Sequence, residues 1–283
     1  MEQNLTTQEN LSPMAQQYPF LLPAMDTGDF TAEELAEDMD GLSLTLPRIK
    51  IPGGGVLQFE MPGSDPDNPD YVKTLVGVML YSHSSNAYWP TENDGDEDQP
   101  PVCQAVDGKQ GVGEPGGLCE DCYYNTYGSS NKPGSSGKAC KNMRMVYLLQ
   151  SGELMPAQLA LPPTSIKPYT QFVNANFLNR KRRVFSGLVQ IGLTRGKNAA
   201  GKEYSVATFT KLRDFEGEEL AQIKSFASAF IDQVKAMNQQ RAAMKEAESN
   251  IVDGEAGPSE PLPDNDGHFS YGVVDGDRDK LPA

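Results

Sequence analysis

Apolar and polar residues alternate in the first ordered part of the chain. The alternation runs over residues 42–51 and is interrupted by Pro47. Alternation is typical of a half-buried strand, and a proline inside it favours an edge strand or a bulge. Residues 71–81 are rich in β-branched and aromatic side chains, which predicts a central strand there.

The pattern continues with four more strands and one helix. Strands are predicted at residues 143–150, 154–161, 184–193 and 203–212. The helix between the second and third of these is expected to begin at Thr164 or Ser165, because hydroxyl side chains cap helix N-termini. Its apolar residues recur at spacings of three and four, which places them on one face. They are Ile166, Tyr169, Val173 and Phe177.

A long amphipathic helix is predicted at residues 217–248. Its apolar residues keep the helical spacing from Leu220 to Met237. Such a face packs on the protein's own sheet, or it forms a seam with a second copy of the chain or with another partner. Both interpretations stay open, and a seam with a second copy would make the protein a homo-oligomer.

Composition limits how much of the 283-residue chain can form a core. Hydrophobic residues make up 38%, and there are 27 glycines and 21 prolines. We expect a disordered acidic arm at residues 1–41, a β-rich α+β domain at 42–215, the helix at 216–248, and a disordered acidic tail at 249–283. No apolar run is long enough to span a bilayer, and the first residues lack the features of a signal peptide. A soluble, cytoplasmic protein without membrane contact is therefore expected.

Charge is distributed unevenly along the chain. The total is −15, yet residues 138–213 hold 13 Lys and Arg against 2 Asp and Glu. Residues 1–137 hold 5 basic and 22 acidic residues, and residues 214–283 hold 6 and 15. A basic centre between acidic ends favours a segment that binds a polyanion. The alternative is a chance fluctuation on a solvated surface.

Four cysteines lie within 38 residues, with the spacing C-x15-C-x2-C-x17-C; they are Cys103, Cys119, Cys122 and Cys140. Two thiolates from a C-x-x-C turn and two more can complete the tetrahedral set that Zn²⁺ prefers. The residues between them are mostly glycine and polar, so a metal is a natural way to order them. The sequence predicts a structural zinc loop at residues 101–142. A redox pair, disulfides and unmodified thiols are the alternatives.

Templates for catalysis are missing from the sequence. It contains no phosphate-binding GxxxxGK[ST] loop, no HExxH and no GxSxG. Four cysteine ligands would leave zinc no open position for substrate. The acidic run at residues 92–98 is interpreted as a solvated loop. We therefore expect a protein that is not an enzyme.

Cations and aromatic residues are interleaved from the cysteine segment onward. Phosphates attract cations, and unpaired bases stack on flat apolar rings. No predicted helix has the several base-contacting residues of a duplex reader, so a single-stranded ligand is favoured. The expected phosphate contacts are Lys138, Lys141, Arg144, Arg180, Lys181, Arg182, Arg183, Arg195 and Lys197. The candidates for base stacking are Tyr124, Tyr127 and Trp89; core packing is the alternative for each ring.

One stretch of the sequence supports a family resemblance. From Cys119 it reads C-x-x-C-Y-x-N-x-Y-G-S, from Gly137 it reads G-K-A-C-K-N-x-R, and L-P-P-T-S follows at residues 161–165. With the strand pattern and the basic centre, this resembles the zinc-containing single-stranded DNA-binding proteins of tailed phages and prophages, of the phage T4 helix-destabilising type. The resemblance covers about residues 42–215.

The resemblance implies an OB-like barrel with an inserted zinc loop. It also implies cooperative coating of exposed DNA strands during replication or recombination, and an acidic C-terminal tail that recruits replication proteins. This chain departs from the T4 type, whose zinc ligands include a histidine; here there are four cysteines, and His83 lies 20 residues before the first. The final residues are also less acidic than the resemblance implies.

The expected function is non-catalytic binding of single-stranded DNA, with structural zinc. The alternative is a zinc-stapled protein-interaction module of the replication machinery that does not bind DNA itself, with the long helix as its docking surface. A nuclease is a third interpretation, but the basic region has only Glu153 and Glu203 as carboxylates. The acidic tail is expected to compete with DNA for the basic surface or to bind partner proteins.

Overall fold

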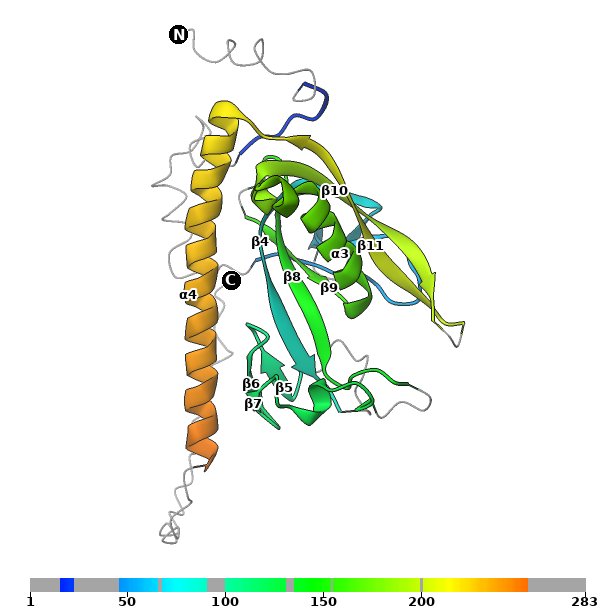
Figure 1. Ribbon diagram of the computed structural model, residues 1–283, viewed down its shortest axis with the longest axis vertical. Coiled ribbons are helices and arrows are strands. Elements are labelled where there is room, and N and C mark those ends of the chain that lie inside the picture. The colour runs from blue at the N-terminus through cyan, green and yellow to red at the C-terminus, as the bar shows by residue number, and fades with distance from the viewer. Residues whose placement is uncertain are drawn as a thin grey trace, which may run out of the picture.

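The computed structural model describes residues 16–22, 46–65, 68–90, 100–130, 135–153, 155–198 and 201–253. The rest of the predicted arm at 1–41, most of the predicted tail at 249–283, and the acidic loop at 91–99 lie outside these ranges. The described part is α+β and rich in strands, in agreement with the predicted class (Figure 1). The strands are β1 (Arg48–Ile49), β2 (Phe59–Asp65), β3 (Asn68–Val72), β4 (Thr74–Tyr88), β5 (Cys103–Ala105), β6 (Gln110–Gly113), β7 (Gly117–Leu118), β8 (Lys141–Leu149), β9 (Ala157–Leu161), β10 (Gly187–Lys197) and β11 (Glu203–Asp214). The α-helices are α3 (Pro163–Asn176) and α4 (Gly217–Asp253).

The long strand β4 organises the sheet. Among the described residues, nine strands form one mixed sheet, and β2 and β3 form a separate hairpin. One edge of β4 pairs with β8 along most of its length. Its other edge pairs with β10 near the beginning and with β5 near the end. This single strand therefore joins the cysteine segment, which contains β5, to the rest of the fold.

The predicted barrel is not closed in the structure. The sheet runs β11-β10-β4-β8-β9-β1, and its outer strands β11 and β1 are not paired with each other among the described residues. Strand β1 has only two residues, and prolines at 47 and 52 deprive the backbone beside it of N–H donors. Side chains bridge the gap instead: the Ser205 hydroxyl donates to the carbonyls of Pro52 and Val56, at 3.2 and 2.6 Å.

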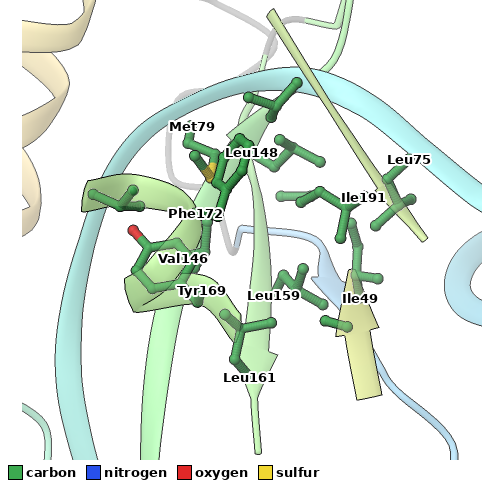
Figure 2. Close-up of a cluster of buried hydrophobic side chains, with 14 of the residues drawn as sticks. Ile49, Leu75, Met79, Val146, Leu148, Leu159, Leu161, Tyr169, Phe172 and Ile191 are labelled. Atoms are coloured by element: carbon green, nitrogen blue, oxygen red, sulfur yellow. The ribbon is translucent and has the colours of Figure 1, made fainter. Parts of the chain in front are cut away.

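One face of the sheet packs on α3. Residues of β4 and β8 alternate between the two faces, as the pattern predicts: Met79 and Leu148 face α3, whereas Leu80 and Leu149 face the opposite side. Figure 2 shows the cluster on the α3 side, where rings from the helix meet aliphatic side chains of the strands. Full burial of one such aliphatic side chain contributes about 1.5–3 kcal/mol.

The opposite face of the sheet packs on α4. Ile223, Ala227 and Val234 are fully buried at one helical spacing, against a cluster that includes Leu149 of β8. The beginning of the amphipathic helix therefore covers its own sheet, which is one of the two expected interpretations. Helix α4 extends to Asp253, five residues beyond the predicted end. Neither it nor the other helices in the described ranges combine the length and apolarity needed to cross a bilayer.

Residues 16–22, which belong to the predicted acidic arm at 1–41, contact the end of the sheet. The ring of Phe20 lies 5.7 Å from that of Phe215, and Phe20 is buried. The Leu21 backbone N–H donates to the Ser151 hydroxyl at 2.9 Å, and its carbonyl accepts from the Gly152 N–H. Few apolar residues suffice for this contact, because Phe215 supplies a ring partner and Ser151 and Gly152 supply hydrogen-bond partners.

Candidate nucleic-acid interface and cysteine cluster

All four cysteines line one small cavity. Cys103 begins β5, Cys119 follows β7, Cys122 precedes the 3-10 helix η2 (Tyr123–Asn125), and Cys140 precedes β8. The cavity they share has a volume of about 10 Å³. That is room for about one water-sized occupant. Cys119 and Cys140 are buried, and the other two are half-buried.

The cavity disfavours the ionised form of the Cys140 thiol. All four cysteines are thiols in the structure. The pKa of Cys140 is raised to about 12, first by burial and then by the neighbouring Cys119, Cys103 and Cys122. The ammonium of Lys138 acts in the opposite direction.

The geometry alone does not form a metal centre. Within the described ranges, no three or more His, Cys, Asp or Glu side chains are close enough together to hold a metal ion. The kind of donor still fits zinc, since four sulfurs without carboxylate or histidine are a common structural zinc set. The predicted zinc site therefore stays a proposal, supported by the donor chemistry and the shared cavity.

Polar contacts order the cysteine segment. The amide of Asn125 donates to the carbonyl of Cys119 at 2.6 Å, and the N–H of Cys140 donates to the carbonyl of Tyr124 at 2.8 Å. Ser129 is 2% exposed, and its hydroxyl donates to Tyr124 and accepts from the N–H of Ala139. These bonds hold η2 against the beginning of β8.

A groove of about 430 Å³ lies where α3 faces the paired ends of β4 and β8. Strands β4 and β8 contribute polar residues to it, η2 contributes Asn125, and α3 contributes a mostly apolar wall. Its lining includes Ser84, Asn86, Asn125, Asn142, Arg144, Ile166, Tyr169, Val173, Asn174 and Leu178. The groove thus brings together three segments that are far apart in the sequence.

A chain of amides crosses one wall of the groove. Asn142 Nδ2 donates to Asn86 Oδ1 at 2.7 Å and to Asn125 Oδ1 at 2.9 Å. Asn86 Nδ2 donates to the carbonyl of Gly108 at 3.2 Å, which fixes the orientation of both strand amides. Asn125 Oδ1 also accepts from Lys138 Nζ at 3.1 Å. The cysteine segment is thereby locked to the sheet by hydrogen bonds.

Arg144 is held in the groove by serines and a ring. Its Nε and Nη2 donate to the Ser82 hydroxyl at 3.1 and 3.0 Å, and its Nη1 donates to the Ser84 hydroxyl at 3.3 Å. The guanidinium lies 5.9 Å from the ring centre of Tyr169. Burial raises the pKa of Tyr169, while its hydrogen bond to Ser82 and the charge of Arg144 oppose that rise. Among the described residues no carboxylate forms an ion pair with Arg144, so its charge is available to an anionic ligand.

Two further predicted cations pair with predicted aromatic residues. Lys141 Nζ lies 5.0 Å from the ring centre of Trp89, and Lys138 Nζ lies 5.2 Å from that of Tyr127. Tyr127 is 83% exposed, so its ring is open to a ligand. Tyr124 is half-buried and stacks on Tyr88 at 4.2 Å between ring centres.

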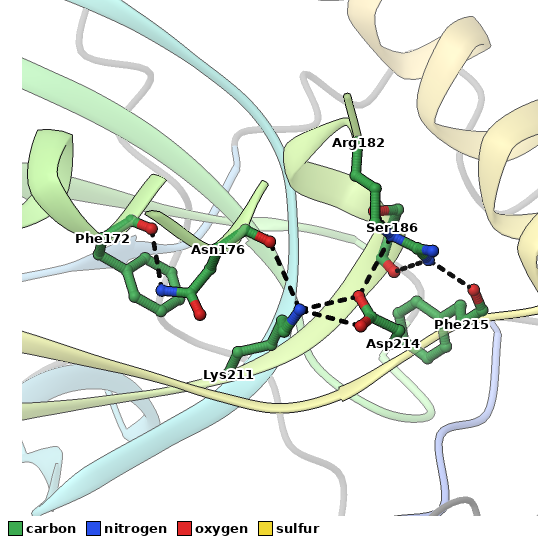
Figure 3. Close-up of polar contacts among 7 residues, drawn as sticks. All are labelled: Phe172, Asn176, Arg182, Ser186, Lys211, Asp214 and Phe215. Atoms are coloured by element: carbon green, nitrogen blue, oxygen red, sulfur yellow. Dashed lines mark hydrogen bonds and ion pairs between the residues drawn. The ribbon is translucent and has the colours of Figure 1, made fainter. Parts of the chain in front are cut away.

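The four consecutive basic residues after α3 have two different environments. Arg180, Lys181 and Arg183 are exposed. Arg182 points inward, donating to Ser186 and to the Phe215 carbonyl, and it forms an ion pair of 3.2 Å with Asp214 (Figure 3). Its charge is already compensated, which makes it a structural residue.

The remaining predicted cations lie on the β10–β11 hairpin. Both pair with Glu203, at 3.6 Å for Arg195 and 3.2 Å for Lys197, and Arg195 also donates to the carbonyl of Gly55. Figure 1 shows the end of this hairpin well away from β5, β6 and β7. The structure therefore places Arg144 in the groove, with Lys138 on the amide of Asn125 that lines it. Lys141 lies beside Trp89 and is not among the described residues that line the groove, and the hairpin pair lies apart.

Sequence reasoning missed the amides of the groove. Asn86, Asn125 and Asn142 carry no charge and follow no helical or strand period, so pattern analysis has no reason to select them. Asn125 and Asn142 do flank cysteines in the segment that supports the family resemblance, which is the one clue they offered.

Comparison of this chain with protein-family models, with curated proteins and with solved structures found no match. Function is therefore argued from the geometry of the groove and its neighbours.

Proposed function

We propose that this protein binds single-stranded DNA and performs no chemistry on it. The observation that carries the proposal is the groove beside α3. Its lining contains Arg144 and several amides, and none of the described residues that line it is a carboxylate. A cationic groove next to exposed rings suits a strand whose phosphates and bases are both accessible.

The residues divide into roles by position. Arg144 and Lys138 would meet phosphates at the groove, and Lys141 would meet them beside Trp89. Tyr127 and Trp89 would offer rings for stacking. Tyr124 is less suited, because Tyr88 already covers one face of its ring. The exposed Arg180, Lys181 and Arg183 follow Leu178, which lines the α3 end of the groove, so they would extend the path of the strand.

Structural zinc is part of the proposal. An ion held by Cys103, Cys119, Cys122 and Cys140 would stiffen the segment that carries Tyr127 and Lys138. It would supply no open coordination position and no reaction step. In this account the metal shapes the interface.

A role in DNA replication or recombination in the cytoplasm follows from the same proposal. The acidic flanks of the chain would bind replication proteins or compete with DNA for the cations. The long helix α4 is the feature that favours the rival function, a protein-interaction module without DNA binding. It continues to Asp253, and Val234 is the last of its residues described as buried.

Fluorescence titration of labelled oligo(dT) at increasing salt tests the proposal. We expect affinity to fall steeply with salt, in proportion to the phosphates neutralised. Lys141→Gln should weaken binding and reduce the slope of log K against log salt by about one. Lys224→Gln is the matched control, since Lys224 is an exposed lysine on α4, which covers the opposite face of the sheet. Absence of binding at low salt would favour the interaction module.

A further inference from the structure

The groove has two chemically different walls. The α3 side presents Ile166, Val173 and Leu178, and Leu178 is 53% exposed. The strand side presents amides and the guanidinium of Arg144. A ligand that fits between them has a flat or apolar face, a polar edge and a negative charge nearby. A nucleotide has all three, since its base has a π-face and its edge carries donors and acceptors.

The hydrogen-bond network leaves one acceptor of the polar wall open. Both hydrogens of Asn142 Nδ2 are used, on Asn86 and Asn125, and the orientation is fixed because Asn86 donates to Gly108. The Oδ1 of Asn142 accepts no hydrogen bond within the described ranges. It therefore suits an N–H donor, and each of the four DNA bases carries at least one such donor on its Watson–Crick edge.

A second amide stands on the opposite wall. Asn174 lies on α3 at helical spacing from Ile166 and Thr170, so the three share the face that lines the groove. Its side chain is exposed and has no hydrogen-bond partner in the described part of the chain. An amide offers a donor and an acceptor together, which matches the mixed edge of a base.

The volume also limits the ligand. About 430 Å³ is at the lower end of the range for small-molecule pockets. One nucleotide is a ligand of this class, whereas a continuous run of stacked bases would need a longer channel.

We propose that the groove binds one unstacked nucleotide, with its base between Leu178 and the amides and its phosphate at Arg144. This inference rests on the proposed function and deepens it, because it assigns to one position of the bound strand a base that is recognised individually. The remaining bases would contact Tyr127, Trp89 and the exposed cations without such recognition.

The test uses the full chain and four mononucleotides, dAMP, dCMP, dGMP and dTMP, with deoxyribose 5-phosphate as the probe that lacks a base. Binding is followed through the side-chain amide NMR signals of Asn142 and Asn174. We expect at least one mononucleotide to shift both signals, and deoxyribose 5-phosphate to bind about tenfold more weakly, the loss of one base contact. Equal binding of the probe without a base would overturn the inference.

Matched variants locate the site. Asn174→Ala should weaken mononucleotide binding about fivefold to tenfold. Gln171→Ala should not, because Gln171 is an exposed amide on the same helix that does not line the groove. Equal effects of the two variants would place the nucleotide elsewhere and contradict the proposal.

The oligo(dT) titration separates the two proposals. If oligo(dT) binds but no mononucleotide shifts the groove amides, the base site is wrong and the proposed function stands. If mononucleotides bind the groove but oligo(dT) does not bind, the site is one for free nucleotides and the proposed function fails. If neither binds, both proposals fail.

Discussion

The sheet with its two covering helices α3 and α4, here called the layered body, and the cysteine segment at residues 101–140 are stabilised in different ways. In the body, two apolar clusters fill the spaces between α3, the sheet and α4. Among the described residues of the cysteine segment, the buried side chains are few and small; they are Ala105, Cys119, Ser129 and Cys140. Main-chain and amide hydrogen bonds hold that segment in place. The comparison shows that one chain can fold most of its length by burial and still depend on polar contacts where ligands are expected.

The two regions meet at the groove. The body supplies Arg144 and the apolar wall, and the cysteine segment supplies Asn125 and, through it, Lys138. A binding site at this junction depends on both kinds of stabilisation. Changes in either region should therefore have separable effects, on global stability in one case and on local order and binding in the other.

The largest loss of stability is expected from a substitution in the core of the layered body. Leu148 is fully buried between the sheet and α3. Leu148→Ala removes apolar contacts and leaves a cavity, so it should lower the free energy of unfolding by about 3 kcal/mol. Urea denaturation measures this, with Val76→Ala on β4 as the control because Val76 is 38% exposed. Equal losses for the two variants would contradict the assignment of this core.

A smaller loss is expected where α4 is tied to the sheet. Arg213 is 6% exposed and donates two hydrogen bonds to Glu219, at 2.7 and 2.6 Å. Glu219→Ala leaves this buried guanidinium without its carboxylate and should cost about 2 kcal/mol. Glu218→Ala changes an exposed neighbour of the same type and should leave the urea midpoint nearly unchanged. A midpoint shift of similar size for Glu218→Ala would show that the ion pair is unimportant.

Loss of a cysteine or of the proposed metal should change the order of the cysteine segment alone. Cys140→Ser, or removal of metal by a chelator, should increase amide hydrogen exchange in residues 101–140 and leave β8 protected beyond Arg144. If the segment shapes the groove, oligo(dT) affinity should fall about tenfold, which corresponds to about 1.4 kcal/mol. Elemental analysis of the purified chain provides the control for metal content. Unchanged exchange in the segment would argue against a structural metal.

The smallest expected effect is the change in stability with pH that comes from His83. Burial lowers the pKa of His83 below its ordinary value of 6.5, and the charge of Arg144 acts in the same direction, whereas Asp107 opposes it. Since the unfolded chain takes up the proton first, His83 stabilises the fold above pH 6.5, and this contribution is lost as pH falls from 6.5 toward the lowered pKa. Urea midpoints at about pH 7.5 and about pH 5.5, on either side of that range, should differ less for His83→Gln than for the unchanged chain. An equal pH difference in both proteins would exclude His83 as the cause.

The fold was predictable wherever the alternation of residues carried the information. Strands β4 and β8 lie in apolar runs, because α3 covers one face of the sheet and α4 the other, and such runs indicate buried strands. The open edge between β11 and β1 was not predictable, because it depends on how Ser205 meets the carbonyls of Pro52 and Val56, which are distant in the sequence.

The candidate site was predictable in part. The basic segment includes Arg144, which lines the groove, and Lys138, which contacts the groove amide Asn125, whereas Lys141 lies beside Trp89 outside the lining. Arg182 could not be separated from its three basic neighbours by sequence, since its partner Asp214 comes from a distant strand. The groove amides could not be predicted from charge or from periodicity. Only the position of Asn125 and Asn142 beside cysteines indicated a role for them.

The anchoring of residues 16–22 has a practical consequence for shortened versions of this protein. Trimming to residue 42, where the strand pattern starts, would uncover the ring of Phe215 and leave the Ser151 hydroxyl and the Arg213 Nε without the backbone groups of Leu21 and Tyr18. The trimmed protein would expose an apolar surface near the beginning of α4. It should aggregate more readily than a version that starts before Gln16.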